Sequence, residues 1–472
     1  MFGDGQQSVS RSTRRRLLKT VGAAATVGLA GCSGGGNGSG SDGGDGDGGD
    51  DGDGGDGGDD GDGSTPEPTA TEPEGGVEAD ADTVVTMWSL LIGGDGEPFE
   101  DMVRDFNEQA DGMAVEVTRV PWGEYYDRLF TSMTGGDPPD LAIYHTAQIP
   151  QFVDSMVPLN DHISFDPYLD NIAAATEFDG DHVSAPMDAH PAATYYNKEL
   201  YAEVGYEEPP TSWDEFIELN DALVDAGYGA YDAGEDVHSL RVWLPWVAGR
   251  GTDPLPPAAG GDGVEANFNN DDGLAVMESW QTAYQEKEWA EVDSATSWES
   301  FNQGEHAAIN DGTWAFSRYS EGGPEELDFE WGVYNPSVGP GMDQGKTLAD
   351  SHTLGIPRNP NRDDDVEQAA IRAIEYLTQD RNADWGMQAG HLPATEEAFN
   401  SDELRNSDVW DKSLNVFYEM ATNDQLYYQP PTTSTNEYTN ALYQNVDTVR
   451  AGEKDPQAAI EDAAQTINNI QW

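Results

Sequence analysis

Four ring-bearing side chains lie at the ends of three apolar, β-rich segments in the first part of the chain. They are Trp88, Trp122, Tyr144 and His145. Indole faces pack against apolar surfaces of a ligand, while phenol and imidazole groups exchange hydrogen bonds with its polar groups. The chemistry that this set predicts is non-covalent binding of a small polar solute.

Hydrolysis of glycosides is the main alternative chemistry, because hydrolytic clefts also combine aromatic rings with a pair of carboxylates. The chain has 90 acidic residues, so a pair is expected by chance and carries little information. Beyond residue 82 there is no GxSxG motif, and neither GxxxxGK[ST] nor HExxH occurs; the eight histidines show no close metal-ligand spacing. We therefore expect no catalysis, no cofactor and no metal, with a glycoside hydrolase as the alternative.

The elements that position these rings follow a strand and helix alternation. Segments 83–90, 113–120 and 140–145 are β-rich, and residues from Glu97 onward carry apolar side chains at helical spacing. A second helical segment, 122–136, ends in a glycine pair. This order predicts an α/β sheet with parallel strands and right-handed crossovers, and ligands of such sheets lie beyond the carboxyl ends of the strands.

Four further segments carry a resemblance to a known family. They are TYYNKELYAEVGYEEPPTSWDEF (194–216), FNQGEHAAINDGTWAF (301–316), SHTLGIPRNPNRDDDVEQAAIRAIEYL (351–377) and GHLPATEEAF (390–399). In this order they resemble the family 1 extracellular solute-binding proteins of ABC importers, the maltodextrin-binding type. The resemblance covers nearly the whole chain beyond the first 82 residues.

The resemblance implies a two-lobed, periplasmic-binding-protein-like α/β fold, each lobe a mostly parallel sheet flanked by helices, with the ligand cleft between the lobes. We expect an N-lobe of residues 83–188 and 352–400 and a C-lobe of residues 189–351 and 401–472. The lobes would close on a solute about a hinge, and the closed protein would deliver it to membrane permease subunits.

The strand ends and the resemblance together predict the cleft side chains. Trp314 follows a glycine turn where family members commonly carry a cleft ring, and the two crossings between lobes lie near residues 188–190 and 352. A tryptophan is more often a core residue and a loop histidine is usually solvated, so that alternative stays open for each position. The candidate ligand-binding residues are Trp88, Trp122, Tyr144, His145, Asp188, His190, Trp243, Trp246, Trp314 and His352.

A sugar is the expected solute, because its C–H faces stack on aromatic rings and its hydroxyl groups need polar partners. Relatives also carry phosphate esters and other polar solutes. The few basic residues, among them Arg241, Arg318 and Lys346, leave a phosphorylated ligand open.

The N-terminal segment resembles an export signal. Arg14 and Arg15, followed by Leu17 and Leu18, match the twin-arginine pattern, and the small residues before Cys32 match a lipoprotein cleavage box. This order predicts signal residues 1–32 and a lipid on Cys32 that anchors the protein at the extracellular face of the membrane. An uncleaved leader with a free thiol, or a surface lipoprotein without a transport role, are the alternatives.

Charge and composition set the environment. Residues 33–82 are a low-complexity acidic tether, and the whole chain has a formal net charge of −68. Such a charge excludes nucleic acid as a partner and indicates a surface adapted to very high salt, as in a haloarchaeal protein. An ordinary acidic mesophilic protein is the alternative, and we expect a monomer.

Overall fold

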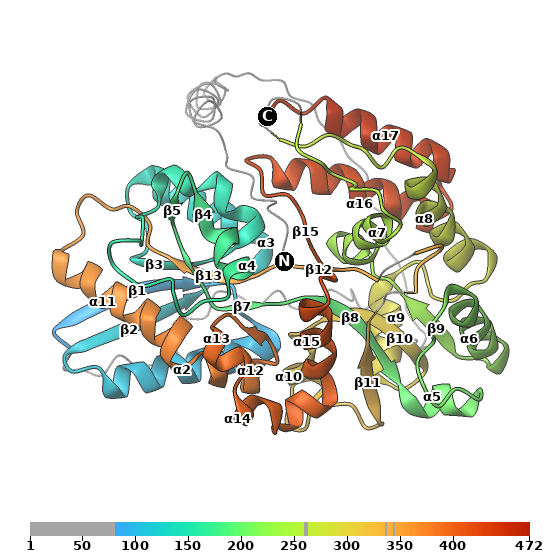
Figure 1. The fold of residues 1–472 in the computed structure, drawn as a ribbon, viewed down its shortest axis with the longest axis horizontal. Coiled ribbons are helices and arrows are strands. Elements are labelled where there is room, and N and C mark those ends of the chain that lie inside the picture. The colour runs from blue at the N-terminus through green and yellow to red at the C-terminus, as the bar shows by residue number, and fades with distance from the viewer. Residues whose placement is uncertain (1–80, 259–262, 336–337, 343–344) are drawn as a thin grey trace, which may run out of the picture.

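The computed structural model describes residues 81–472 except 259–262, 336–337 and 343–344. The predicted export signal at Arg14 and Arg15, the lipidation site Cys32 and almost all of the tether lie outside the described residues. Two lobes stand side by side, with strands crossing between them (Figure 1). Among the described residues, no helix has the length and apolar character needed to cross a membrane.

One lobe, here called the N-lobe, is built on a five-stranded sheet. Its order is β2 (Met113–Arg119), β1 (Thr83–Ser89), β3 (Leu141–His145), β13 (His352–Gly355) and β6 (Ala185–Pro186). The pairs β1–β2 and β1–β3 are parallel, as the strand and helix alternation predicts. Both pairings of β13 are antiparallel. The chain returns from the C-lobe at the second crossing, so β13 begins where β3 ends, with His352 paired to His145.

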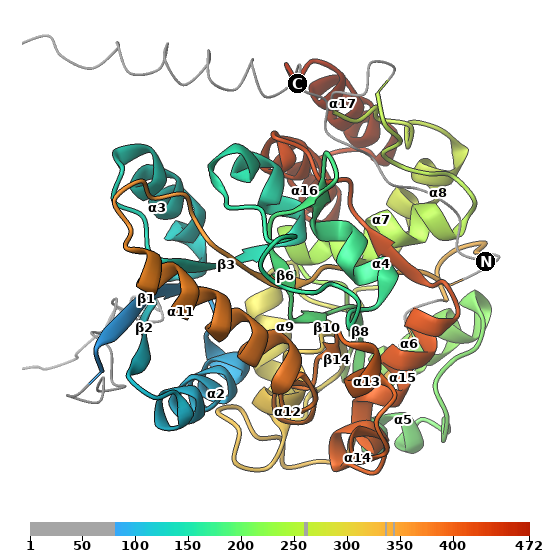
Figure 2. The ribbon, with the colours of Figure 1, turned by 60° about the vertical axis from the view of Figure 1, so that its left-hand side comes forward.

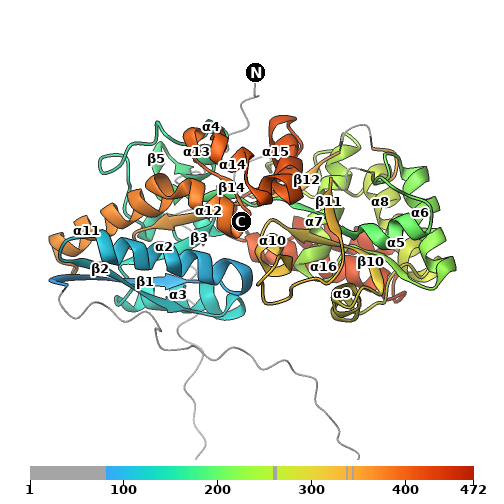
Figure 3. The ribbon, with the colours of Figure 1, turned by 90° about the horizontal axis from the view of Figure 1, so that it is seen from below.

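The helices of the N-lobe cover both faces of this sheet. Helices α2 (Gly96–Gln109) and α11 (Asp364–Glu375) lie on one face and α3 (Trp122–Gly135) on the other (Figures 2 and 3). The predicted apolar stripe of α2 is buried, from Phe99 to Phe106. Helix α3 ends at Gly136, whose φ of 80° is the left-handed conformation that glycine adopts without strain.

The other lobe, the C-lobe, is built on a four-stranded sheet. Its order is β11 (Trp331–Tyr334), β8 (Ala192–Asn197), β10 (His306–Gly312) and β9 (Gly229–Asp232). Only β10–β9 is parallel, since β8 runs antiparallel to both of its neighbours. The two-lobed α/β architecture is confirmed, and the sheets are mixed rather than mostly parallel because the strands next to the crossings run against the rest.

Helices surround the C-lobe sheet (Figure 1). Ser212 caps α6 by accepting a hydrogen bond from the backbone N–H of Glu215, as its position before the helix predicts. The C-terminal helices α16 and α17 pack against α7 and α8. The C-lobe helices are α5 (Lys198–Glu203), α6 (Trp213–Ala226), α7 (Val237–Gly249), α8 (Asp271–Gln281), α9 (Ser294–Asn302), α10 (Ala315–Tyr319), α16 (Thr435–Arg450) and α17 (Pro456–Asn468).

Three short strand pairs complete the fold, two of them next to the crossings between the lobes. Strand β12 (Thr347–Ala349) pairs with β15 (Leu426–Tyr428), and β7 (Asp188–Ala189) pairs with β14 (Leu392–Pro393); β4 (Glu177–Phe178) and β5 (Asp181–His182) form a hairpin in the N-lobe. The remaining helices are α4 (Asp170–Ala173), α12 (Asn382–Ala389), α13 (Glu396–Phe399), α14 (Asp402–Arg405) and α15 (Asn415–Thr422). Each crossing therefore brings residues of both lobes to one place.

Asp447, on α16, is the carboxylate whose burial has the clearest consequence for stability. Its Oδ2 accepts a hydrogen bond from the backbone N–H of Asp236 (3.0 Å), while Oδ1 is buried and has no hydrogen-bond partner among the residues that the structure describes. Burial raises the pKa of Asp447 to about 7, and the negative charges of Asp236 and Glu235 oppose ionisation further, against the attraction of Arg450. An unfolded aspartate has a pKa of about 3.9.

We expect the contribution of Asp447 to stability to fall as the pH rises from about 4 to about 7, because the folded state then holds a proton at Asp447 that the unfolded chain releases. Asp447→Asn should raise the free energy of unfolding at pH 8 by about 1 to 3 kcal/mol and flatten this pH dependence. Denaturant unfolding in molar KCl at pH 5 and pH 8 measures both effects. The control Glu461→Gln removes the same charge from an exposed site on α17 and should change stability by less than about 0.5 kcal/mol. Equal pH slopes in Asp447→Asn and the parent protein would contradict the prediction.

Candidate functional site

Two adjoining cavities lie between the lobes. The larger has a volume of about 570 Å³ and the smaller about 200 Å³, and Ala147 and Gln429 belong to the walls of both. Each is lined by segments that follow N-lobe strands and by segments of the C-lobe, so movement of one lobe against the other changes both cavities.

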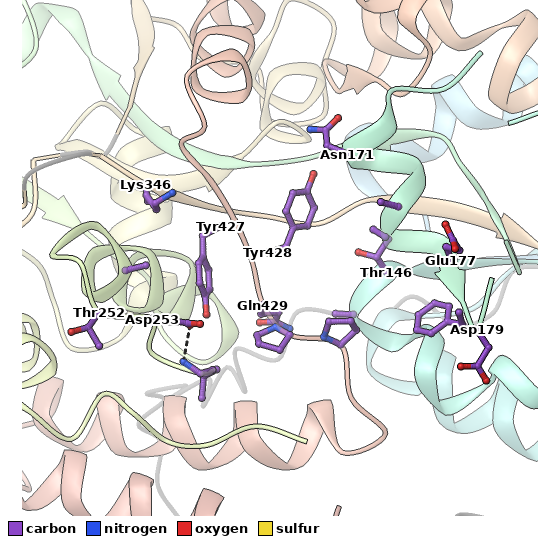
Figure 4. Close-up of a pocket in the computed structure, with 18 of the residues that line it drawn as sticks. Thr146, Asn171, Glu177, Asp179, Thr252, Asp253, Lys346, Tyr427, Tyr428 and Gln429 are labelled. Atoms are coloured by element: carbon purple, nitrogen blue, oxygen red, sulfur yellow. Dashed lines mark hydrogen bonds between the residues drawn. The ribbon is translucent and has the colours of Figure 1, made fainter. Parts of the chain in front are cut away.

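The larger cavity is centred on β15. Tyr427 and Tyr428 project from this strand, with Lys346 and Asp253 on one side and Glu177 on the other (Figure 4). The hydroxyl groups of both tyrosines are buried. None of the ten predicted binding residues lines this cavity.

The smaller cavity gathers four of the predicted residues. Trp122 begins α3, His145 ends β3, His190 lies between β7 and β8, and Trp314 immediately precedes α10. Trp122 is 45% exposed and meets the His145 ring edge-on, with centroids 4.8 Å apart. Strand ends and crossings thus converge here, as they do in other α/β proteins with a ligand at the carboxyl ends of strands.

Two more predicted residues, Asp188 and His352, form the layer directly behind this cavity. The Asp188 carboxylate accepts hydrogen bonds from Nδ1 of His190 (2.9 Å), Nδ1 of His352 (2.8 Å) and Nε1 of Trp385 (2.8 Å), and from the backbone N–H of His352 (2.9 Å). With four donors around it, this fully buried carboxylate has no free acceptor position. It joins the two crossings between the lobes.

The charges of this layer are set by burial and by mutual contact. Burial and the neighbouring His352 lower the pKa of His190, and burial with the same neighbour lowers that of His145. For His352 the burial effect is outweighed by the Asp188 carboxylate, which raises the pKa of His352. Asp188 itself, despite burial, has a pKa well below its usual value because of His352, His391 and His190. Burial therefore disfavours the charged forms of His145 and His190, whereas the contact between Asp188 and His352 favours a carboxylate on the one and an imidazolium on the other.

The remaining four predicted residues lie outside both cavities. Trp243 and Trp246, on α7, are buried in the C-lobe core, where Trp246 meets Trp280 edge-on, and Tyr144 is fully buried next to Phe152. Trp88 packs partly buried against the N-lobe core. At these four positions the side chain packs in or against a hydrophobic core and does not line either cavity. Trp243 and Trp246 lie on the part of α7 that packs into the C-lobe core, whereas Arg241 of the same helix lines the smaller cavity. Alternate residues of a strand point to opposite faces of its sheet.

Three residues outside the set of ten candidates, Arg241, Asp350 and His391, complete the smaller cavity and its surroundings; of these, the sequence offered Asp350 as a weaker candidate for binding a hydroxyl group and Arg241 as one of the few basic residues. Arg241 lines the cavity and lies over the Trp314 ring, 4.3 Å from its centroid. Burial lowers the pKa of Arg241 to about 10. Asp350 also lines the cavity, and His391 lies behind it, hydrogen-bonded to Thr313 (2.5 Å) and Asp95 (3.0 Å). His391 stands within the quoted GHLPATEEAF segment, but no local pattern distinguishes it from a surface histidine.

A two-lobed α/β protein with a ring-lined cavity between its lobes has the architecture of a solute receptor. The chain belongs to the family of bacterial extracellular solute-binding proteins, which residues 101–417 match. The matched residues include the C-lobe sheet, both crossings and every strand of the N-lobe sheet except β1.

Individual relatives and neighbours agree with this family. A binding protein of Brucella abortus (strain 2308) is 21% identical over 394 residues, which are 79% of this chain and 90% of the relative. The arabinooligosaccharide-binding protein of Halalkalibacterium halodurans is 26% identical over 161 residues, 32% of this chain and 36% of that protein. The fold is similar to that of maltose-bound T. maritima MalE3, with a TM-score of 0.71 and 18% identity over 82% of this chain and 99% of the other.

Proposed function

We propose that the protein is the receptor of an ABC import system and captures a sugar or a short oligosaccharide in the smaller cavity by closure of its two lobes. The observation that carries this proposal is the convergence of Trp122, His145, His190 and Trp314, from both lobes, on one cavity. Indole rings offer stacking faces for a sugar and the imidazoles offer hydrogen bonds to its hydroxyl groups. The names of the arabinooligosaccharide-binding and maltose-bound relatives support a carbohydrate.

Closure follows from contacts with both lobes. A solute that bonds to His145 on the N-lobe side and to Trp314 on the C-lobe side stabilises only the arrangement in which both are near, so binding and closure are one equilibrium. In this conformation the Arg241 guanidinium lies against one face of Trp314. A stacking solute therefore either uses the other face or displaces Arg241, whose N–H groups then become donors to solute oxygens.

The size of the cavity limits the solute. Its volume of about 200 Å³ is below the ~300–1,000 Å³ of sites for drug-sized ligands. One sugar ring fits this space better than a long chain, and a longer solute would extend past Ala147 and Gln429 into the larger cavity. We also propose the division into lobes at residues 83–188 with 352–400 and 189–351 with 401–472.

We further propose that the receptor is held at the extracellular face of the membrane by a lipid on Cys32, after export directed by Arg14 and Arg15. About 50 residues of acidic tether would then separate the anchor from the N-lobe, a reach on the order of 40 Å by random-coil scaling. That reach allows an anchored receptor to meet its permease. The high negative charge supports a habitat of high salt.

A thermal-shift panel on the full chain in molar KCl with EDTA tests the receptor function. The panel contains neutral sugars, oligosaccharides, polyols, sugar phosphates and amino acids. We expect a rise in melting temperature that saturates with one class of sugar, because a ligand that binds only the folded state stabilises it, with the compound recovered unchanged. A shift confined to amino acids or sugar phosphates would overturn the sugar assignment. Consumption of the compound would favour a hydrolase instead.

A further inference from the structure

The smaller cavity holds a set of metal-ligating groups that the sequence spacing does not reveal. Nitrogen and oxygen atoms of His145, His190 and Asp350 lie within 4.8 Å of one another, and all three residues line the cavity. They come from the end of β3, from the first crossing between the lobes and from the second crossing. Two imidazoles and one carboxylate are a ligand set for Zn²⁺ and neighbouring divalent transition metals, whereas Mg²⁺ and Ca²⁺ prefer oxygen ligands alone.

Each of the three candidate ligands is held in place by at least one hydrogen bond to a neighbouring protein atom. Nδ1 of His190 donates to Asp188 (2.9 Å), Nδ1 of His145 lies 2.8 Å from the hydroxyl of Tyr126, and Oδ1 of Asp350 accepts from Thr146 and from the backbone N–H of Ser351. Metal-binding histidines almost always have such an outer partner, which fixes the tautomer and the ring orientation. With Nδ1 engaged in this way, Nε2 is the nitrogen left to bind a metal.

The other ring nitrogen of each histidine and the other carboxylate oxygen of Asp350 have no hydrogen bond within the described protein. Over the part of the chain that the structure describes, no hydrogen bond joins a protein atom to Nε2 of His145, Nε2 of His190 or Oδ2 of Asp350. Because the three residues line the cavity, water, an ion or a solute can reach them from there.

A second group of metal-ligating residues, Asp188 with His190, His352 and His391, is less suitable. The Asp188 carboxylate already accepts four hydrogen bonds, and both ring nitrogens of His391 are engaged, by Thr313 and Asp95. This group is better described as the outer shell of the first, since Asp188 orients His190.

We propose that His145, His190 and Asp350 bind one divalent transition-metal ion, of the zinc class, at the wall of the smaller cavity. Three protein ligands leave at least one coordination position open, and that position faces the cavity, where water or an oxygen atom of a solute completes it. The site rests on the geometry of this cavity and not on the identity of the imported solute. The solute panel described above contains EDTA and therefore tests solute binding by the metal-free protein, whereas the measurements below test the metal without a solute, so each proposal has its own readout.

Equilibrium dialysis and visible spectroscopy of the full chain, stripped with chelator, test the site with Zn²⁺ and Co²⁺. The chain has 90 acidic residues, so the measurements contain molar KCl and excess Mg²⁺ to saturate sites made of carboxylates alone. We expect one Zn²⁺ per chain, competed by Co²⁺, with the ligand-field bands of a cobalt ion bound to nitrogen and oxygen.

Variants assign the ligands. His145→Gln and Asp350→Asn should each weaken Zn²⁺ binding by more than about 100-fold, and Tyr126→Phe, which removes only the outer partner of His145, by about tenfold. His162→Gln removes an exposed histidine of the N-lobe and should leave the affinity unchanged. Circular dichroism and melting temperature confirm that each variant is folded. Absence of saturable Zn²⁺ binding, or equal affinity in folded His145→Gln, Asp350→Asn and parent proteins, would overturn the site.

Discussion

Replacing Asp188 with alanine is expected to lower the free energy of unfolding by about 3 to 5 kcal/mol, the range measured when one partner of a buried ion pair is removed. The side chain is fully buried and accepts all four of its hydrogen bonds from buried donors on His190, His352 and Trp385. Alanine leaves the imidazole of His352 and the indole N–H of Trp385 without an acceptor. Denaturant unfolding in molar KCl measures the loss.

Two further variants separate the charge from the hydrogen bonds. Asp188→Asn keeps the size and one acceptor oxygen but sets an NH₂ group against existing donors, so its cost should lie between those of alanine and the parent residue. Asp181→Ala removes an exposed carboxylate from β5 and should change stability by less than about 0.5 kcal/mol. A cost of less than about 1 kcal/mol for Asp188→Ala would show that Asp188 does not join the crossings as described.

Replacing Trp314 with alanine is expected to weaken solute binding by roughly 30- to 150-fold, equivalent to about 2 to 3 kcal/mol for a well-packed aromatic residue at the centre of a binding site. The indole lines the cavity from the C-lobe side, 6.0 Å from the His190 ring, and supports the Arg241 guanidinium. Its removal takes away both a stacking face and the support of a donor group. Isothermal titration with the sugar identified by the thermal-shift panel measures the change.

Two further variants control for loss of structure, one at another tryptophan and one with phenylalanine in place of Trp314. Trp410, on the segment before α15, is partly buried and lies outside both cavities, so Trp410→Ala should bind within about twofold of the parent protein. Trp314→Phe keeps a flat ring and should lose less than about tenfold in affinity. If Trp314→Ala and Trp410→Ala bind equally well, Trp314 is not a stacking residue for this solute.

Local pattern was sufficient for the elements of the N-lobe. The buried stripe of α2, the glycine end of α3 and the parallel pairing of β1, β2 and β3 agree with expectations drawn from apolar spacing and turn residues. These features depend on residues close in the chain, where period and propensity act directly. The antiparallel entry of β13 could not be predicted in this way, because strand direction at a crossing depends on where the chain returns from the other lobe.

The candidate residues with rings fall into two groups, those that line the smaller cavity and those that are packed in the core. Trp122 and His145 were predicted because they follow strands of the N-lobe sheet, whereas His190 and Trp314 were predicted from the family resemblance, which implies a crossing and a cleft ring at these positions. The sequence alone did not distinguish Trp243 and Trp246 from the cavity residues, because it does not show whether a neighbouring helix covers an indole ring. Coverage is decided by packing between segments far apart in the chain.

The sequence by itself determined the class of this protein: two α/β lobes, an acidic surface, and aromatic and imidazole groups at the ends of strands. Only the tertiary structure decided that His145, His190, His352 and His391 lie together around Asp188, although they are spread over almost 250 residues of the chain. The physical reason is that each crossing returns the chain to the same inter-lobe edge. Groups without local spacing therefore become neighbours, and the chemistry of the cavity arises from this convergence.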